Sequence, residues 1–128
     1  MSKFPKSEIL RNKSRIEALF SKGESFNVYP LRVVYLTEPP SADSQSTQVL
    51  VSIPTKKFKK AVDRNKLKRR VREAYRLNKH HLKRSEDRFY LLIGYIYIGK
   101  EIESYDLIAR KLKQSLQRLT KLVGSKEN

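Results

Sequence analysis

The sequence contains no cysteine and no long hydrophobic run. Without cysteine, disulfide bonds and thiolate metal sites are excluded, and the composition fits the reducing cytoplasm. The longest apolar stretch, residues 89–98, is about half as long as the roughly twenty residues of a membrane-spanning helix. The lysines near the start of the chain are not followed by the apolar run of a signal peptide. We therefore expect a soluble, cytoplasmic protein without a membrane partner.

Acidic side chains are also scarce, and they are scattered along the chain. There are 13 of them against 29 lysines and arginines, which gives a formal net charge of +16. A protein nuclease usually needs clustered carboxylates or histidines to bind metal ions or to move protons. The two histidines, His80 and His81, are expected at a helix end, where adjacent side chains point in different directions. We expect no catalytic residue, no metal site and no cofactor bound by the protein alone.

The positive charge is concentrated between residues 56 and 84. This segment holds fourteen lysines and arginines and two acids, so it carries +12 of the net +16. A large charge of one sign opposes compaction, and it is understandable when the partner is a polyanion. Nucleic acid, an anionic membrane and an acidic protein are the candidates, and a small basic domain favours nucleic acid.

Residue spacing within this segment predicts an amphipathic helix from about Lys60 to Lys79. At about 100° per residue, one side collects an apolar stripe. The stripe consists of Leu67, Val71, Ala74 and Tyr75, continued by Asn78 and Leu82. The far side collects Asn65, Lys68, Arg69, Arg72 and Arg76.

Two less specific interpretations of this helix fit the pattern poorly. A face that is merely solvated usually mixes both signs of charge, because opposite charges one turn apart support a helix. A membrane-surface or calmodulin-binding helix usually carries Trp or Phe on its apolar side. Arginine forks match phosphate oxygens well, so the pattern favours RNA binding.

A shorter helix is predicted over residues 12–23. Ser14 and Glu17 have the spacing of a capping box, in which each side chain satisfies a backbone N–H of the first turn. Gly23 stands where a left-handed C-terminal cap belongs. One face of this helix is apolar and consists of Ile16, Leu19 and Phe20.

Three segments read as strands. Residues 31–37 and 48–53 are rich in β-branched and aromatic residues, and we expect them to pair as a hairpin around the polar loop 38–47. A third strand starts at Asp87 or Arg88 and contains FYLLIGYIYI. Its continuous apolarity predicts a central position in the sheet, covered on both faces.

A final helix is predicted after Ser104, which caps it. Its apolar residues follow helical spacing and are Ile108, Leu112, Leu116, Leu119 and Val123. The order helix, strand, strand, helix, strand, helix predicts an α+β sandwich, in which helices pack on a small, mainly antiparallel sheet. We expect residues 1–128 to form a single RNA-binding domain, with 1–8 and 124–128 as frayed ends.

The segment from Ala61 to Arg76, AVDRNKLKRRVREAYR, resembles the signature of the bacterial ribonuclease P protein subunit. That signature is a basic helix that opens with Arg-Asn-Arg/Lys and continues in a KRxxRE-like pattern. Here it reads Arg64, Asn65 and Lys66, then Lys68, Arg69, Arg72 and Glu73. A Phe-x-x-Gly helix end at Phe20 and Gly23 extends the resemblance, which covers most of the chain in order.

The resemblance implies a fold and a function. The fold would be an α/β sandwich of the ribosomal-protein-S5-domain-2-like type, with a left-handed β–α–β crossover that the general preference for right-handed connections does not predict. The protein would assist a catalytic RNA that removes the 5′ leader of precursor tRNA. Both RNAs would be partners, and the RNA subunit would hold Mg²⁺ and perform the hydrolysis.

Composition alone leaves a second function open. A non-enzymatic RNA-binding module, such as a ribosomal protein or an RNA chaperone, would have the same charge and length. DNA binding is disfavoured because the chain shows no helix-turn-helix or zinc-finger pattern.

The resemblance also assigns roles to individual residues. The residues expected to contact the catalytic RNA are Arg64, Asn65, Lys66, Lys68, Arg69, Arg72 and Arg76. A cleft between the first helix and the sheet would hold the leader, lined by Phe20, Val33, Tyr35, Lys56 and Lys57. Phe20 and Tyr35 would stack on bases, unless they are core residues. The chain departs from the family pattern at Ile16, where a second aromatic is frequent, and at Lys59, where glycine is common.

Overall fold

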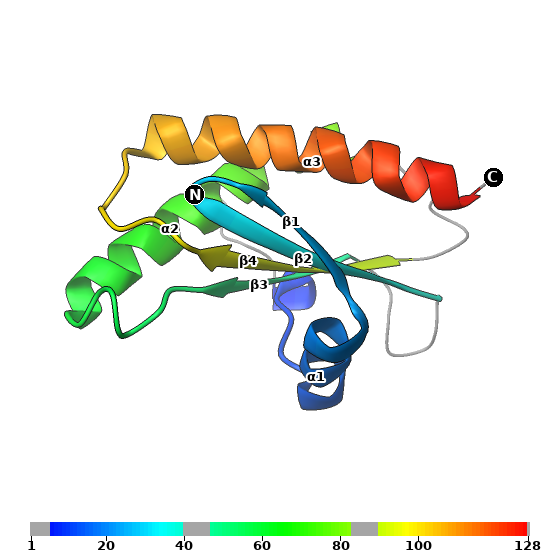
Figure 1. Cartoon of the computed structure of the whole chain (residues 1–128), viewed down its shortest axis with the longest axis horizontal. Helices are drawn as coiled ribbons and strands as arrows, with labels where there is room; N and C mark the ends of the chain where they lie inside the picture. Colours follow the sequence, from blue (N-terminus) through cyan, green and yellow to red (C-terminus); the bar gives the residue numbers. More distant parts are fainter. Residues whose placement is uncertain (1–5, 40–46, 83–89, 128) are drawn as a thin grey trace.

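The computed structural model describes residues 6–39, 47–82 and 90–127, with side chains of the last helix described as far as Val123. Figure 1 shows the arrangement of the elements in these residues. The helices are α1 (Lys13–Lys22), α2 (Ala61–Asn78) and α3 (Tyr105–Glu127), with 3-10 turns η1 (Lys6–Glu8) and η2 (Lys79–His81). The strands are β1 (Glu24–Val28), β2 (Leu31–Glu38), β3 (Gln48–Ser52) and β4 (Tyr90–Tyr97).

The strands form one sheet in the order β1-β2-β4-β3. The pairs β1–β2 and β2–β4 are antiparallel, whereas β3–β4 is parallel. The predicted hairpin between β2 and β3 is wrong, because β4 lies between them. The central position predicted for β4 is confirmed, and it explains the correction: a strand that is apolar on both faces is most stable where both its edges are paired and both its faces are covered.

Strand β1 is the element that the sequence pattern did not predict. Its sequence, ESFNV, buries only Phe26 and leaves three of its five residues exposed. Only Phe26 and, in part, Val28 face the core from this edge strand, so its hydrophobic alternation is too short to predict a strand.

The sheet is covered by α2 and α3 on one face and by α1 on the other (Figure 1). Successive residues of β2 alternate between the two faces, as strand geometry requires. Val33 and Tyr35 are buried in the larger core with α2 and α3, while Val34 packs in the smaller core with Leu19 of α1. This alternation decides which residues can line a cleft beside α1.

The ends of α1 differ from the prediction. The helix begins at Lys13 and is capped by Asn12, whose Oδ1 accepts a hydrogen bond from the Arg15 backbone N–H at 3.1 Å. Asparagine is as good an N-cap as serine, so the Ser14 capping box does not form. Gly23 is extended rather than left-handed, with φ −71° and ψ 158°. A side chain is excluded there because its Cβ would lie 2.3 Å from the Leu19 carbonyl oxygen.

Part of each end that the sequence predicts to fray has regular structure. Residues 6–8 form η1, and Glu8 makes an ion pair with Lys79 at 3.0 Å. The backbone of α3 stays helical to Glu127. The Ser104 cap is confirmed, because its Oγ accepts a hydrogen bond from the Leu107 backbone N–H at 3.2 Å. The predicted start of the third strand, at residue 87 or 88, lies outside the described residues.

Candidate nucleic-acid interface

The inner side of α2 anchors the helix to the core as predicted. Leu67, Val71 and Ala74 are fully buried, and Tyr75 is nearly so. Asn78 lies at the end of this stripe, where its Nδ2 donates to the Ala74 carbonyl oxygen at 2.8 Å. Burial of a side chain as large as leucine contributes roughly 1.5–3 kcal/mol, so the stripe fixes which side of α2 faces water.

The start of α2 is held by one of the residues predicted to bind RNA. Lys60, at the N-cap, makes no side-chain capping bond. Instead, Arg64 Nη1 donates to the carbonyl oxygens of Phe58 and Lys59, each at 2.8 Å. Phe58 is buried with its ring edge-on to Tyr97, at 5.6 Å between centroids. Arg64 therefore ties the entering loop to the helix, a role that the sequence pattern did not reveal.

Five of the predicted residues form what we call the α2 band: Asn65, Lys66, Lys68, Arg69 and Arg72. Asn65 and Arg69 are exposed, and the other three are partly exposed. Within the described part of the chain, none of the five makes a side-chain hydrogen bond or an ion pair with another residue. The band therefore presents four cations and an amide to solvent on a helix that is fixed from behind.

Arg76 is not part of this band, because its guanidinium is already paired with a carboxylate of the protein. Its Nε donates to Glu73 Oε2 at 3.2 Å, and its Nη2 donates to the second carboxylate oxygen. The hydrogen bond from Arg76 lowers the pKa of the Glu73 carboxyl and raises that of the guanidinium. A phosphate at Arg76 would have to compete with this carboxylate.

A shallow hollow lies beside the α2 band, where α2 meets the start of α3. Its lining residues are Lys66, Arg69, Arg70, Glu73 and Tyr105. Arg70 Nη1 donates to the Glu103 carbonyl oxygen at 2.5 Å, which links α2 to the segment just before α3. The sequence pattern did not single out Arg70, because its position on the wheel is between the stripe and the band.

A second cleft, with a volume of about 340 Å³, lies on the other face of the sheet, beside α1. It is lined by Phe20, Gly23, Ser25, Arg32, Val34, Ile96 and Ile98. Phe20 is 47% exposed, so it is a surface residue of this cleft and not a core residue. Arg32 Nη2 donates to Ser25 Oγ at 3.4 Å, which places a guanidinium at the cleft.

Val33 and Tyr35 do not line this cleft, contrary to the prediction. Val33 is fully buried and Tyr35 is 5% exposed, both on the face covered by α2 and α3. The Tyr35 ring packs 6.0 Å from that of Phe26. The error is one residue of register, which moves every side chain of a strand to the opposite face. Arg32 is the exposed polar residue of β2 and shares its face with Val34, a signal that groups these two side chains but does not say which helix covers them.

The two lysines predicted for the cleft lie in the turn after β3. Lys57 Nζ donates to the carbonyl oxygen of Ile98, a residue of the cleft lining, at 2.9 Å. Lys56 is exposed in the same turn. Neither lysine lines the cleft, contrary to the prediction.

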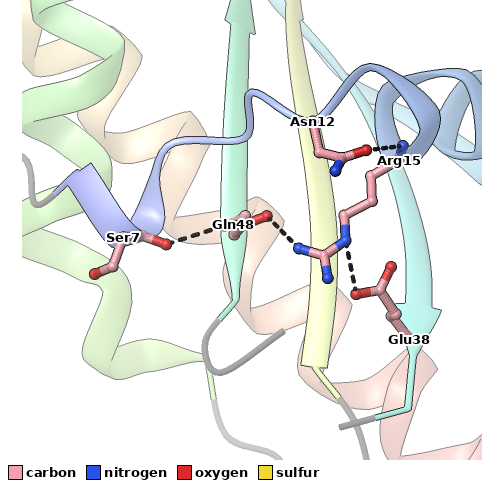
Figure 2. A network of polar contacts seen from close by, with 5 residues as sticks. All are labelled: Ser7, Asn12, Arg15, Glu38 and Gln48. Carbon is pink, nitrogen blue, oxygen red and sulfur yellow. Dashed lines mark hydrogen bonds and ion pairs between the residues drawn. The ribbon is translucent and has the colours of Figure 1, made fainter. Parts of the chain in front are cut away.

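A polar network centred on Arg15 holds α1 against the sheet (Figure 2). Arg15 Nε lies 3.3 Å from Glu38 Oε1 at the end of β2, and Arg15 Nη1 donates to Gln48 Oε1 at the start of β3 at 3.3 Å. Gln48 Nε2 donates in turn to the Ser7 carbonyl oxygen at 3.2 Å. Because β4 lies between β2 and β3, Arg15 bridges two strands that do not touch.

Two further features concern metals and membranes. The rings of His80 and His81 lie side by side in η2, with centroids 4.1 Å apart, rather than pointing apart as expected for an α-helix. Among the residues that the structure describes, no three His, Cys, Asp or Glu side chains are grouped so as to hold a metal ion. None of the described helices combines the length and the apolarity needed to cross a membrane.

Comparison with known proteins agrees with this geometry. A family model described as Ribonuclease P matches residues 4–121. The ribonuclease P protein component of Porphyromonas gingivalis is 40% identical over 122 residues, which cover 94% of this chain and 88% of that protein. That of Chlorobium phaeobacteroides is 34% identical over 125 residues, covering 89% and 86%.

Solved structures agree in fold. The ribonuclease P protein of Thermotoga maritima superposes with a TM-score of 0.70 at 25% identity, covering 87% of this chain and 96% of that one. The Staphylococcus aureus protein, at 17% identity, shares the fold with a TM-score of 0.65 over 91% and 97% of the two chains. The predicted α+β sandwich is confirmed. The chain therefore belongs to the ribonuclease P protein family, and this membership gives it an RNA partner and a role in an endoribonuclease complex.

Proposed function

We propose that this protein binds the RNA subunit of ribonuclease P through the α2 band and holds the 5′ leader of precursor tRNA in the cleft beside α1. It thereby assists an RNA-catalysed removal of the leader. The observation that carries the proposal is the α2 band itself, four cations and an amide without protein partners among the described residues, on a helix whose other side is buried.

The α2 band suits a phosphate backbone. Each lysine or arginine that reaches a phosphate releases condensed counterions, which drives binding without reading sequence. Arg69 and Arg72 lie almost one turn apart on the same side of α2, so their forks can reach neighbouring phosphates. Asn65 adds a neutral amide for a sugar or a base edge. Because α2 is fixed by its buried stripe, little ordering of the backbone is needed on binding.

The cleft beside α1 suits a single strand. Phe20 offers an exposed ring on which a base can stack, and Arg32 offers a cation for the adjoining phosphate. Base stacking and a phosphate contact together bind a single strand without reading its sequence, so leaders of different sequence could be held in the same cleft. Helices α1 and α2 cover opposite faces of the sheet (Figure 1), so a protein that uses both the cleft beside α1 and the α2 band can contact two RNA molecules at once.

We assign the hydrolysis to the RNA subunit. Among the described residues, no three His, Cys, Asp or Glu side chains are grouped so as to hold a metal ion, and we expect the RNA to hold Mg²⁺. The protein's own residues would bind and position the two RNAs. A cytoplasmic location, where tRNA precursors are made, follows from this role.

Reconstitution tests the proposal. The protein would be mixed with a transcript of the Porphyromonas gingivalis ribonuclease P RNA and a precursor tRNA at a Mg²⁺ concentration too low for the RNA alone. We expect the protein to raise the cleavage rate, and an Asn65→Ala/Arg69→Gln/Arg72→Gln variant to raise it less. No stimulation by the unaltered protein would instead indicate a non-enzymatic RNA-binding module.

A further inference from the structure

Helix α3 carries a second concentration of positive charge. Residues 105–123 include five lysines and arginines but only one acid, Asp106, so they have a net charge of +4. Residues 56–84 carry +12, so the two segments together account for the whole net charge of +16. The rest of the chain is balanced. Helix α2 itself carries seven of these lysines and arginines against two acids, and it lies on the same face of the sheet as α3 (Figure 1).

Three of the five α3 cations, Arg110, Lys113 and Lys121, lie on the side that packing does not use, together with the exposed acid Asp106. The inner side is fully buried and consists of Ile108, Leu112, Ser115, Leu116, Leu119 and Val123. Ser115 Oγ lies 2.8 Å from the Tyr95 hydroxyl, so the one polar residue of this side has its partner inside the core. The α3 outer face, as we call it, consists of Arg110, Lys113, Gln114, Gln117 and Lys121, all of them exposed. These five residues fall within an arc of about 100° and extend over about 16 Å of helix.

Ordinary solvation does not account for this composition. On α1, Lys13 is followed one turn later by Glu17, the opposite-sign spacing that supports a helix in water. On α3, Asp106 has this spacing to Arg110, although no ion pair joins the two among the described residues, and the sequence from Leu107 to Val123 contains no further acid. Within the described part of the chain, Arg110 and Lys113 have no hydrogen-bond or ion-pair partner. Like charges one turn apart destabilise a helix, so a polyanion is the partner that relieves them.

Arg118 of α3, unlike Arg110 and Lys113, has a structural role. The Arg118 guanidinium lies 4.3 Å from the centre of the Phe26 ring of β1, where it makes a cation–π contact. Arg118 is thus placed by the fold. Arg110 and Lys113 have no such contact among the described residues.

We propose that the α3 outer face is a second contact for the phosphate backbone of the RNA subunit, separate from the α2 band. Arg110 and Lys113 bind phosphate oxygens, and the amides of Gln114 and Gln117 donate to phosphate or 2′-hydroxyl oxygens. The partner is the RNA subunit rather than the leader, because α3 and the leader cleft lie on opposite faces of the sheet. The inference rests on the proposed function for the identity of the RNA.

The test is the salt dependence of binding to the Porphyromonas gingivalis ribonuclease P RNA, without tRNA. We expect an Arg110→Gln/Lys113→Gln variant to reduce the slope of log K against log salt by about 1.4–1.8, or roughly 0.7–0.9 for each lost phosphate contact. The matched control, Lys13→Gln/Lys22→Gln on α1, makes the same change of charge at exposed positions on the opposite face of the sheet. We expect the control to leave the slope unchanged.

Two results would overturn the inference. One is an unchanged slope for the α3 variant, and the other is an equal loss for the α1 control, which would make the effect one of bulk charge. An Arg69→Gln/Arg72→Gln variant on α2 separates this inference from the proposed function. If the α2 variant lowers the slope and the α3 variant does not, only the α3 contact is refuted; if neither does, the RNA interface on α2 fails as well.

Discussion

The network around Arg15 provides the most detailed prediction, because it determines where α1 sits. An Arg15→Met substitution keeps the aliphatic stem of the side chain and removes the guanidinium. Glu38 Oε1 would then lose its compensating charge. This oxygen is buried and makes no hydrogen bond with any described residue, although Arg15 Nε lies 3.3 Å away. Gln48 would lose a donor as well.

The magnitude follows from how far the pair is buried. Exposed ion pairs contribute about 0–1 kcal/mol, whereas breaking a fully buried pair costs about 3–5 kcal/mol. The side chains of Arg15 and Glu38 are 14% and 21% exposed, so the pair lies between these limits. We expect Arg15→Met to lower the free energy of unfolding by about 2 kcal/mol, which for a chain of this length is a fall in Tm of roughly 6–10 °C.

Urea unfolding of Arg15→Met, Glu38→Gln and the double variant measures the pair itself. Because Glu38→Gln removes the buried charge, we expect it to recover part of the loss in the Arg15→Met background. The coupling energy between the two substitutions should be about 1 kcal/mol or more. A coupling energy of zero, or an Arg15→Met variant as stable as the unaltered protein, would refute the reasoning.

The same network should affect RNA binding, because α1 carries Phe20. If α1 is loosened, Phe20 and the sheet are no longer held at a fixed separation. We expect Arg15→Met to reduce the preference for precursor tRNA over mature tRNA, and Arg15→Lys to restore part of it. Lys13→Met, an exposed change on the same helix, is the matched control. An equal preference in all three variants would contradict a positioning role for Arg15.

Three further predictions concern other residues. Phe20→Ala should weaken the binding of leader-containing substrate by about 1–3 kcal/mol for the lost stacked base and leave mature tRNA unaffected in a titration of both. Tyr35→Ala should act on stability instead, with a loss of about 3–5 kcal/mol in urea unfolding, because its ring is in the core. Burial raises the pKa of the Tyr95 hydroxyl, so the folded state retains this proton at alkaline pH and its stability falls as pH rises above about 10. Tyr95→Phe should flatten that fall between pH 9 and 11, and an unchanged slope would contradict the assignment.

For the helices, the sequence pattern predicts which side is buried but not which side chains are paired. The period of α2 is regular over eighteen residues, and the buried stripe of Leu67, Val71 and Ala74 follows it. The side that faces water could therefore be predicted. That Arg64 and Arg76 are occupied by protein groups could not, because their partners depend on the local conformation of the loop before α2 and on side-chain rotamers.

For the sheet, the sequence pattern predicts neither the order of the strands nor which face of β2 meets α1. Alternation along β2 separates Arg32 and Val34 from Val33 and Tyr35, but it does not say which set meets α1. That choice depends on the order of the strands and on which helices cover each face. The predicted hairpin was wrong because β3 pairs with β4, about forty residues later in the chain, and not with β2. Long-range pairing of this kind leaves no local signal.

The central claim is that the outer side of α2 faces the RNA subunit, and the absence of cysteine makes it directly measurable. A single Ala61→Cys substitution removes no cation and puts a unique attachment point for an iron chelate one turn before Asn65, on the same side of α2. Ser14→Cys on α1 is the neutral control on the opposite face of the sheet. Hydroxyl radicals generated from position 61 should cut the bound RNA subunit at a few sites, and radicals from position 14 should not cut those sites. Equal cutting from both positions, or none from position 61, would contradict the claim.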